Sequence, residues 1–356
     1  MKENRLNRVV RGMEALGLEQ ILVSSPASVY YLTGAWVEPG ERMLALHIHK
    51  SGDVRLYANR MFALKGNVGA ELVEFDDTED SAKILADALR PGAIGVDKLW
   101  PSQFTIRLMD ARSDIRPVLG SKPVDDARML KDAEEIALMR ESSRKNDVAI
   151  ARAMEAVVPG ATESSVADAY ARAAQELGAG SGFPPLVCFG KNCAEPHHST
   201  DNTELRPGDS VILDVGLSWN RYFSDMTRTA FFGEPTDEQR RVHDIVVKAN
   251  AAGRAAARPG VPMKEIDRAA RKVIEDAGYG PHFIHRTGHG IGLEVHEPPD
   301  ASAVSETIAE PGMVFSVEPG VYLPGRFGVR EEDLVLITED GAETLNRLPH
   351  ELRVLG

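Results

Sequence analysis

The stretch "HRTGHGIGLEVHE", residues 285–297, threads three histidines through glycines within twelve residues. Carboxylates flank this stretch on both sides in the chain, two before it and two after it. Four carboxylates and one imidazole form an oxygen-rich ligand set of the kind that manganese, cobalt or zinc accepts. We therefore expect five separated residues to meet in space as ligands of divalent metal ions: Asp214, Asp225, His289, Glu318 and Glu332.

The first two acids belong to a predicted strand hairpin. The apolar runs "DSVILDVGLSW" (209–219) and "RYFSDMTRTAFF" (221–232) are joined by a short polar turn, which we place at Trp219-Asn220. That turn would set Asp214 directly opposite Asp225, with Cβ atoms about 5 Å apart. Two carboxylates so close repel unless a cation lies between them or one is protonated, and Arg221 or Arg228 is an alternative neutraliser.

The second pair of acids follows the same plan. The runs "MVFSVEPGVY" (313–322) and "FGVREEDLVLIT" (327–338) flank a turn centred on Gly325, which sets Glu318 opposite Glu332. Carboxylates that bridge two metals imply metals about 3.5–4 Å apart, which activate a water at neutral pH and polarise a carbonyl. The expected reaction class is metal-assisted hydrolysis.

An internal repeat supports two similar halves. "VVPGATESSVADAYARAAQELGAG" (157–180) and "ARPGVPMKEIDRAARKVIEDAGYG" (257–280) match at an offset of 100 residues, and each predicts a Pro-Gly turn, a helix and a glycine stop. Downstream, "RPGDSVILDVG" (206–216) and "EPGMVFSVEPG" (310–320) both place Pro-Gly six residues before a carboxylate. Two matched pairs in the same order indicate duplication between residues 127 and 350.

The residues before this repeat predict a separate α/β domain. The composition turns polar around 120–126, so we divide the chain into domains 1–122 and 123–356, with a long helix over 127–155.

The loop 30–36, "YYLTGAW", carries three aromatics that serve either an interface or packing within the domain. His47 and His49 share one face of a strand, but no further ligand type lies nearby, so we do not expect a metal there. Expected helices are 3–17, 60–67, 80–89 and 101–110, and expected strands are 20–24, 43–48, 54–57, 72–75 and 94–96.

Composition limits the classes of partner and compartment. Of 356 residues, 41 are Lys or Arg and 54 are Asp or Glu, and the net charge of −13 argues against nucleic acid or anionic membranes as partners. Cys188 and Cys193 are the two cysteines, too few for a disulfide framework, so we expect free thiols in a reducing compartment. The first twenty residues contain no apolar signal segment, and no run approaches eighteen apolar residues. We expect a cytoplasmic protein without a membrane span.

Taken together, the motifs resemble those of the pita-bread metallopeptidases, which include methionine aminopeptidase, prolidase and aminopeptidase P. The matching motifs are "DVG", "SDMTRT", "TGHGIGLEVHE", "VEPG" and "VREED". "FPPLVCFGKNCAEPHHST" (183–200) and "FIHRTGHGIGLEVHEPP" (283–299) resemble the Xaa-Pro peptidase branch, and "YYLTG" is similar to its creatinase-like N-terminal domain. The implied fold is α+β: a C-terminal pita-bread domain of two pseudo-symmetric halves, and a smaller α/β creatinase-like N-terminal domain.

The resemblance implies a role for each ligand of two divalent ions per chain, taken as Mn, Co or Zn. Asp214 should chelate one metal, and His289 and Glu318 should hold the other. Asp225 and Glu332 should bridge both metals. Glu318 is also similar to the family residue that takes the proton of the attacking water and passes it to the leaving amine.

Further residues take roles by the same resemblance. His296 resembles the imidazole that stabilises the tetrahedral intermediate, His197 a histidine on the substrate side, and His285 a histidine lining the proline pocket. Tyr322 and Arg330 are similar to residues that orient the ligating carboxylates. Alone, His285 or His197 would more often be a packed or capping residue, and Tyr322 could equally be core. His198, beside His197, is expected to be solvated.

The predicted substrate depends on whether the site offers a cation to the carboxylate of a terminal proline. Prolidase cleaves Xaa-Pro dipeptides and aminopeptidase P trims longer Xaa-Pro peptides, so a dipeptidase needs a cation for the proline carboxylate. In some prolidases an arginine follows "HExP", whereas the matching residue here is Asp300. We therefore expect an aminopeptidase P-like enzyme acting on peptides of three or more residues with proline second. The alternative is an Xaa-Pro dipeptidase in which another arginine, such as Arg326, substitutes.

Two remoter readings and one assembly hypothesis complete the expectations. Some relatives with this fold, creatinase among them, work without metals, and others are non-catalytic peptide-binding modules; retention of all five ligands argues against both. The resemblance also implies a homodimer, in which Trp36 reaches over the neighbouring subunit's site.

Overall fold

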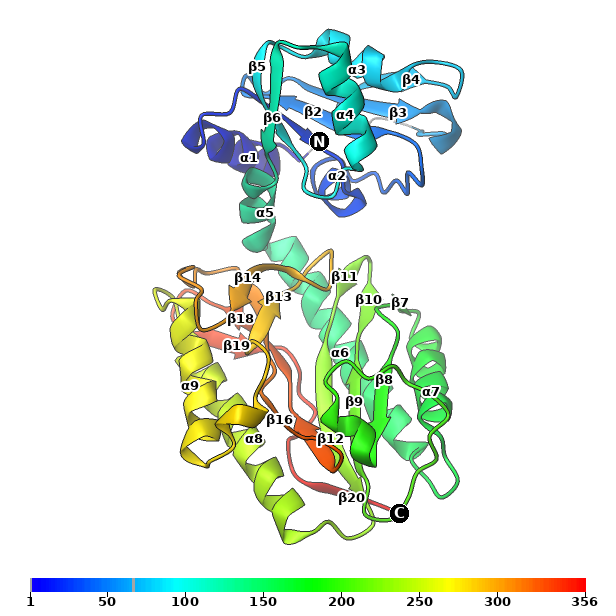
Figure 1. Cartoon of the computed structure of the whole chain (residues 1–356), viewed down its shortest axis with the longest axis vertical. Helices are drawn as coiled ribbons and strands as arrows, with labels where there is room; N and C mark the ends of the chain where they lie inside the picture. Colours follow the sequence, from blue (N-terminus) through cyan, green and yellow to red (C-terminus); the bar gives the residue numbers. More distant parts are fainter. Residues whose placement is uncertain (1, 66–67) are drawn as a thin grey trace. The chain divides into compact units, whose positions relative to one another are not determined.

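The computed structural model describes residues 2–65 and 68–356 and divides into two compact units, Met1–Arg128 and Met129–Gly356 (Figure 1). The division falls after Arg128, whereas the sequence placed it after residue 122. The polar composition of 120–126 led to the predicted boundary, but most of this stretch lies in helix α5 (Lys122–Met129), whose Pro123, Val124 and Ala127 are buried. Buried apolar side chains therefore tie this stretch to a folded unit.

The first unit is built on a six-stranded mixed sheet of order β4-β3-β2-β1-β5-β6 (Figure 1). All residues of β1 and β2, at its centre, are buried, as expected for strands covered on both faces. The predicted α/β class of this half is therefore correct. Its elements are α1 (Glu3–Ala15), β1 (Gln20–Val23), α2 (Pro26–Thr33), β2 (Leu44–His49), β3 (Val54–Asn59), η1 (Arg60–Phe62), β4 (Glu71–Phe75), α3 (Ser81–Ala88), β5 (Gly92–Val96), α4 (Ser102–Ala111) and β6 (Ile115–Leu119).

Three local predictions in this unit were wrong. The helix expected over 60–67 is a single 3₁₀ turn, η1, and residues 66–67 lie outside the described residues.

Half of the expected aromatic loop 30–36 is the end of helix α2, which Ser25 caps and Gly34 ends with a φ of 77°. Tyr31 is buried there and donates to Ala127 O at 2.8 Å, so it packs within its own unit. Strand β6 was missed, because Pro117 interrupts its pattern.

The second unit shows the predicted duplication. Helices α7 (Glu163–Glu176) and α9 (Met263–Asp276) are both 14 residues long and lie exactly one repeat apart in the chain. The glycines of the preceding Pro-Gly turns, Gly160 and Gly260, have φ of 82° and 83°, which only glycine adopts readily. With α6 (Ala133–Glu155) and α8 (Asp237–Ala256), these helices flank the strands in two pairs, α6 with α7 and α8 with α9 (Figure 1).

The strands between the helix pairs form several small sheets. Their orders are β20-β12-β9-β8, β14-β13-β15-β18-β19, β11-β10-β7 and β16-β17. The bounds are β7 (Gly180–Ser181), β8 (Leu186–Phe189), η2 (Gly190–Ala194), β9 (Ser210–Val215), β10 (Leu217–Trp219), β11 (Tyr222–Phe223), β12 (Met226–Phe232), η3 (Gly280–His282), β13 (Gly288–Gly290), β14 (Glu297–Ala301), β15 (Val314–Val317), β16 (Gly320–Leu323), β17 (Phe327–Arg330), β18 (Asp333–Ile337), β19 (Ala342–Thr344) and β20 (Arg353–Leu355).

The register of the first hairpin differs from the prediction. Asp214 pairs with Thr227 and not with Asp225, because the two-residue turn is Asn220-Arg221. Both turn residues have positive φ, 47° and 73°, the conformation of a type I′ hairpin turn. The slip is two residues, and side chains alternate with a period of two, so both acids stay on the same face of the hairpin.

The register of the second hairpin is as predicted. Val317 pairs with Asp333 and Gly320 with Arg330, and the same register between these two ladders sets Glu318 opposite Glu332. The predicted centre at Gly325 is therefore correct. Its φ of 72° explains why a glycine stands there.

Two expectations from composition can be compared with the fold. Cys188 and Cys193 are buried free thiols, as predicted, and Cys193 Sγ donates to Cys188 O at 3.1 Å. Within the described ranges, no helix combines the length and the apolar character that a bilayer crossing requires.

His47 makes the first unit sensitive to acid. Its Nε2 lies 3.2 Å from Gln20 Oε1. Burial lowers the pKa of His47 to about 4, helped by the charges of His49, Arg55 and Arg90. In an unfolded chain a histidine titrates near 6.5, so acid protonates the unfolded state first. The stability linked to His47 is present above about pH 6.5 and is lost as the pH falls toward 4.

We predict that His47→Gln, which keeps a donor for Gln20, removes this acid-sensitive part of the stability. Between pH 7.5 and 4.5, the free energy of unfolding of the wild type should fall by about 2 kcal/mol more than that of the variant. Urea titrations at the two pH values measure the difference. An equal fall in both proteins would contradict the assignment.

Candidate metal centre

The five predicted ligands line one cavity of about 500 Å³ in the second unit. They come from different strands or from residues next to strands. Asp214 lies on β9 and His289 on β13, whereas Asp225, Glu318 and Glu332 lie just before β12, just after β15 and just before β18. The cavity is also lined by apolar side chains and by further predicted site residues: Phe183, Pro184, Leu186, Val295, His197, His285, His296 and Arg330.

The ligand atoms approach one another closely. His289 Nε2 lies 3.4 Å from Glu318 Oε1 and 3.9 Å from Asp225 Oδ2. One ligand atom each of Asp225, His289 and Glu332 lies within 4.8 Å of the others, and all three side chains are buried. Such spacing leaves room for an ion between the atoms.

Unpartnered oxygens test whether metal ions fit. In the described part of the chain, Asp225 Oδ1 and Glu332 Oε1 are buried without a hydrogen-bond donor. Burial raises the pKa of both carboxyls well above the usual range, and neighbouring carboxylates raise it further. Burial also raises the pKa of Glu318. A cation among these oxygens would remove both costs, so the residues fit a metal site.

The tautomer of His289 suits a ligand. Its Nδ1 lies 3.1 Å from Gly290 O, and a carbonyl only accepts, so Nδ1 carries the proton. This leaves the Nε2 lone pair directed at Asp225 and Glu318, the arrangement in which metal-bound imidazoles are oriented by their other nitrogen. Burial lowers the pKa of His289 to about 4, so the ring is neutral at pH 7.

A hydrogen-bond chain fixes Asp214 and His285. Arg330 donates from Nη2 to Asp214 Oδ2 at 2.5 Å and from Nη1 to Tyr322 Oη at 2.9 Å. Tyr322 Oη lies 2.9 Å from His285 Nε2, and His285 Nδ1 lies 2.7 Å from Arg286 O. The carbonyl accepts from Nδ1, so Nε2 accepts from the tyrosine. Both ring nitrogens of His285 are therefore engaged, which leaves its ring surface to line the cavity.

The other two predicted histidines lie at the cavity with more exposed rings. The His296 ring packs edge-on against the His289 ring, with centroids 4.2 Å apart. The ring is only partly buried at the cavity, but this burial lowers the pKa of His296 to about 4, and its neighbour His289 lowers it further, so the ring is neutral. His197 is exposed and lines the same cavity.

The expectation for His198 was wrong. Its Nε2 lies 2.9 Å from Glu163 Oε2, and its side chain is 13% exposed. Glu163, His198 and Asp201 could also surround an ion. Glu163, however, already accepts from the backbone N–H groups of Phe189 and Asp201, so it serves as a structural hub and leaves its oxygens little capacity for a metal.

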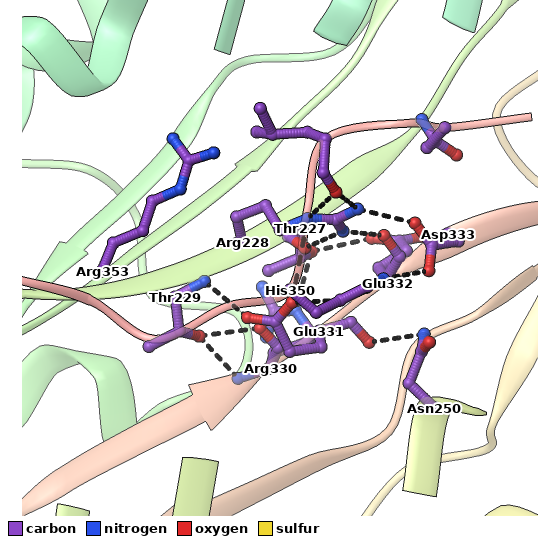
Figure 2. Close-up of polar contacts among 12 residues, drawn as sticks. Thr227, Arg228, Thr229, Asn250, Arg330, Glu331, Glu332, Asp333, His350 and Arg353 are labelled. Carbon is purple, nitrogen blue, oxygen red and sulfur yellow. Dashed lines mark hydrogen bonds and ion pairs between the residues drawn. The ribbon is translucent and has the colours of Figure 1, made fainter. Parts of the chain in front are cut away.

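A buried charge network lies behind Glu332 (Figure 2). Glu332 faces the cavity and accepts from Thr227 Oγ1 at 2.7 Å. Its two acidic neighbours, Glu331 and Asp333, have other partners: His350 lies between them, with Nδ1 2.7 Å from Glu331 Oε2 and Nε2 2.8 Å from Asp333 Oδ2 (Figure 2). These two contacts of His350, called the His350 clamp below, fix the backbone on both sides of Glu332.

Arg228 completes this network. Its Nη2 lies 2.7 Å from Asp333 Oδ1, and its Nη1 donates to Glu332 O at 2.6 Å. The alternative in which Arg228 neutralises Asp214 and Asp225 is therefore wrong, because its guanidinium is engaged by the acids of the second hairpin. Thr227 and His350 were missed at the sequence level: the threonine looks like a strand residue, and no local pattern links position 350 to position 332.

We predict that His350→Ala weakens metal binding by about 10- to 100-fold, since residues that orient ligands typically carry that weight. The change leaves Glu331 and Asp333 buried without their shared partner, so Glu332 loses its fixed backbone. Calorimetric titration of metal-depleted protein with Mn²⁺ measures the affinity. His282→Ala is the matched control, because His282 packs on Tyr279. Equal affinity in wild type and His350→Ala would contradict the clamp.

Buried carboxylates around one imidazole, open to a cavity of substrate size, define the class of metal-dependent hydrolases. Comparison with known families is in agreement: the chain belongs to metallopeptidase family M24, whose model matches residues 137–339. A creatinase/prolidase N-terminal domain matches residues 5–130. The resemblance drawn from the motifs is confirmed, as is the expected architecture of a creatinase-like domain followed by a pita-bread domain.

Similar proteins include several peptidases. The probable dipeptidase PepE of Mycobacterium tuberculosis is 38% identical over 348 residues, which cover 95% of this chain and 92% of that protein. A recombinant prolidase from Thermococcus sibiricus superposes with a TM-score of 0.93 at 32% identity, covering 100% of this chain and 99% of that one. An X-Pro aminopeptidase from Thermotoga maritima gives a TM-score of 0.83 at 29% identity, covering 97% and 100%. The chain is thus a metallopeptidase with similarity to both dipeptidases and aminopeptidases.

Proposed function

We propose that this metallopeptidase is an Xaa-Pro dipeptidase that uses two divalent metal ions. The observation that carries the proposal is the buried cluster of Asp225, His289 and Glu332 at a cavity also lined by Asp214 and Glu318. Among the described residues, one oxygen of Asp225 and one of Glu332 have no hydrogen-bond donor. The relatives named dipeptidase and prolidase favour a dipeptide substrate. This reading was the alternative in the sequence analysis, which preferred an aminopeptidase P-like enzyme because of Asp300.

The reason for that preference is weakened by one contact. Asp300 was expected to repel the carboxylate of a dipeptide, but it forms an ion pair with Arg286. Its charge is therefore compensated within the protein. Arg326, the cation suggested as a substitute, pairs with Glu238 instead.

Each ligand has a proposed role. Asp225 and Glu332 would bridge the two ions, Asp214 would complete one site, and His289 and Glu318 would complete the other. Bound Mn²⁺, Co²⁺ or Zn²⁺ would supply Lewis acidity and lower the pKa of a coordinated water. Arg330 holds Asp214, and Thr227 holds Glu332, so two carboxylates are oriented by direct hydrogen bonds.

The protein's own groups would move the proton. Glu318 accepts a hydrogen bond from Ser316 Oγ at 3.0 Å, and burial raises its pKa, which suits a group that alternates between base and acid. It would take a proton from the attacking water and give it to the proline nitrogen as the peptide bond breaks. His296, neutral at pH 7, would donate to the oxygen of the tetrahedral intermediate. His197 would contact the substrate from the exposed side.

The substrate is an Xaa-Pro peptide. Proline has no N–H in a peptide and carries an apolar ring, so its pocket must accept a bulky tertiary amide. Phe183, Pro184, Leu186 and Val295 supply apolar surface to the cavity, together with the ring of His285.

We predict that Glu318→Gln lowers kcat for Ala-Pro by about 10²- to 10⁴-fold, since the amide cannot carry the proton. The experiment measures hydrolysis by metal-loaded protein. Glu310→Gln, at an exposed position eight residues earlier, is the control and should retain full activity. Activity of Glu318→Gln within a factor of three of the wild type would rule out the proton-transfer role.

The dipeptidase proposal is tested by comparing Ala-Pro with Ala-Pro-Ala at equal concentration. We expect faster hydrolysis of the dipeptide, complete loss of activity in chelator, and recovery with Mn²⁺. Strong preference for the tripeptide would instead support the aminopeptidase P-like reading. A protein that binds no metal and is inert on both peptides would support a non-catalytic peptide-binding module.

Assembly remains part of the proposal. A homodimer would let Trp36 reach a neighbouring subunit's cavity. In the described unit, Trp36 is half-buried, packs against Tyr30 and donates to Glu38 Oε1 at 2.6 Å. If Trp36→Ala changed neither the oligomeric state nor KM, this role would be excluded.

A further inference from the structure

We propose that Arg286, held by Asp300, binds the free C-terminal carboxylate of the dipeptide and so makes this enzyme prefer dipeptides. The proposal rests on the function proposed above and names the residue that would set its specificity. Arg286 directly follows His285 in the stretch that carries the metal ligand His289, and it lines the same cavity.

The need for a cation follows from the lining of the cavity. Four of the lining residues are the proposed metal ligands, and the substrate's carboxylate gives up water when it enters the cavity, so it requires a positive partner apart from them. A dipeptide places that carboxylate on the proline itself, one residue beyond the bond that is cleaved. The partner must therefore lie at the cavity wall and reach solvent.

Arg286 is the cation that meets this requirement. Among the described residues that line the cavity, the two arginines are Arg286 and Arg330. Arg330 is 3% exposed, and its guanidinium is engaged by Asp214, Tyr322 and Thr227.

The Arg286 guanidinium has capacity left for a ligand. Its side chain is 37% exposed, and in the described part of the chain its ion pair is made from Nη1 to Asp300 Oδ1. A guanidinium presents five N–H donors in a rigid fork, which matches a carboxylate through two parallel hydrogen bonds. The edge that Asp300 does not use can therefore bind a second carboxylate.

Asp300 fixes where that fork lies. On the β13–β14 ladder, His289 pairs directly with Asp300, so the acid stands beside the metal ligand on the neighbouring strand. Arg286 reaches across to it. The Asp300 side chain is 57% exposed, so water screens its charge while its geometry orients the arginine. Asp300 is thus a positioning residue and not a source of repulsion.

The experiment compares Ala-Pro with Ala-Pro-amide, which has the same scissile bond but no terminal carboxylate. We measure kcat and KM for wild type, Arg286→Ala, Arg286→Lys and Asp300→Asn, all loaded with Mn²⁺. Arg268→Ala is the matched control, because Arg268 is an exposed arginine that pairs with Glu265. Thermal unfolding checks that each variant folds, and Arg286→Lys keeps the test valid if the alanine variant does not.

The wild type should favour Ala-Pro over the amide. Arg286→Ala should lower the ratio of kcat/KM for the two substrates by about 10- to 100-fold, mainly through KM for Ala-Pro. Arg286→Lys should lower it less, because an ammonium keeps the charge but not the fork. Asp300→Asn should also lower it, by a few-fold, whereas a repelling Asp300 would make the same variant raise it.

Two results would overturn the proposal. They are a ratio that Arg286→Ala leaves unchanged, as it would be if both substrates lost activity equally, and a ratio that rises in Asp300→Asn. Each of them leaves the peptidase assignment intact as long as the wild type cleaves Ala-Pro. A wild type that is inert on both substrates would overturn the proposed function and this inference together.

Discussion

Repulsion among buried carboxylates is the constraint on which the second unit depends. One oxygen of Asp225 and one of Glu332 lie within 4.8 Å of each other and of His289. At that separation, two unit charges repel by roughly 3 to 4 kcal/mol with an effective dielectric constant near 20. Burial, and after it the neighbouring carboxylates, raise the pKa of both acids, so without cations they retain protons. Metal ions would replace those protons.

Arginines pair with some of the acids near the cluster and not with others. Asp214 is paired with Arg330, and Asp333 is paired with Arg228. Both pairs also join the two halves of the unit, since each arginine lies on the opposite half from its acid. The protein thus places an arginine on each of these two acids, whereas Asp225 and Glu332 each keep, among the described residues, one buried oxygen without a donor. That pattern is what a metal site requires and what a purely structural ion network would avoid.

The sequence predicted the parts of this site that depend on local spacing. Pro-Gly turns and the offset of 100 residues located the two halves, and the five ligands predicted from the motifs all line one cavity. The predicted register of the first hairpin was wrong by two residues, because the turn uses Asn220 and Arg221 in a conformation that favours glycine. The acids stayed on the correct face only because strands repeat every two residues.

Contacts made across long distances in the chain could not be predicted. Nothing near His350 points to the acids flanking Glu332, and nothing near Asp300 shows that Arg286 neutralises it. The pair of Arg286 and Asp300 changed the substrate assignment, because the charge of Asp300 had been interpreted without its partner. A residue's charge predicts its effect on a ligand only once the neighbouring strand is known.

Anomalous diffraction from crystals grown with Mn²⁺ tests the central claim most directly. We predict two manganese peaks about 3.5–4 Å apart, both within bonding distance of Asp225 and Glu332, with Asp214 on one ion and His289 and Glu318 on the other. A cavity that holds no anomalous peak at saturating Mn²⁺, with these carboxylates still clustered, would contradict the account.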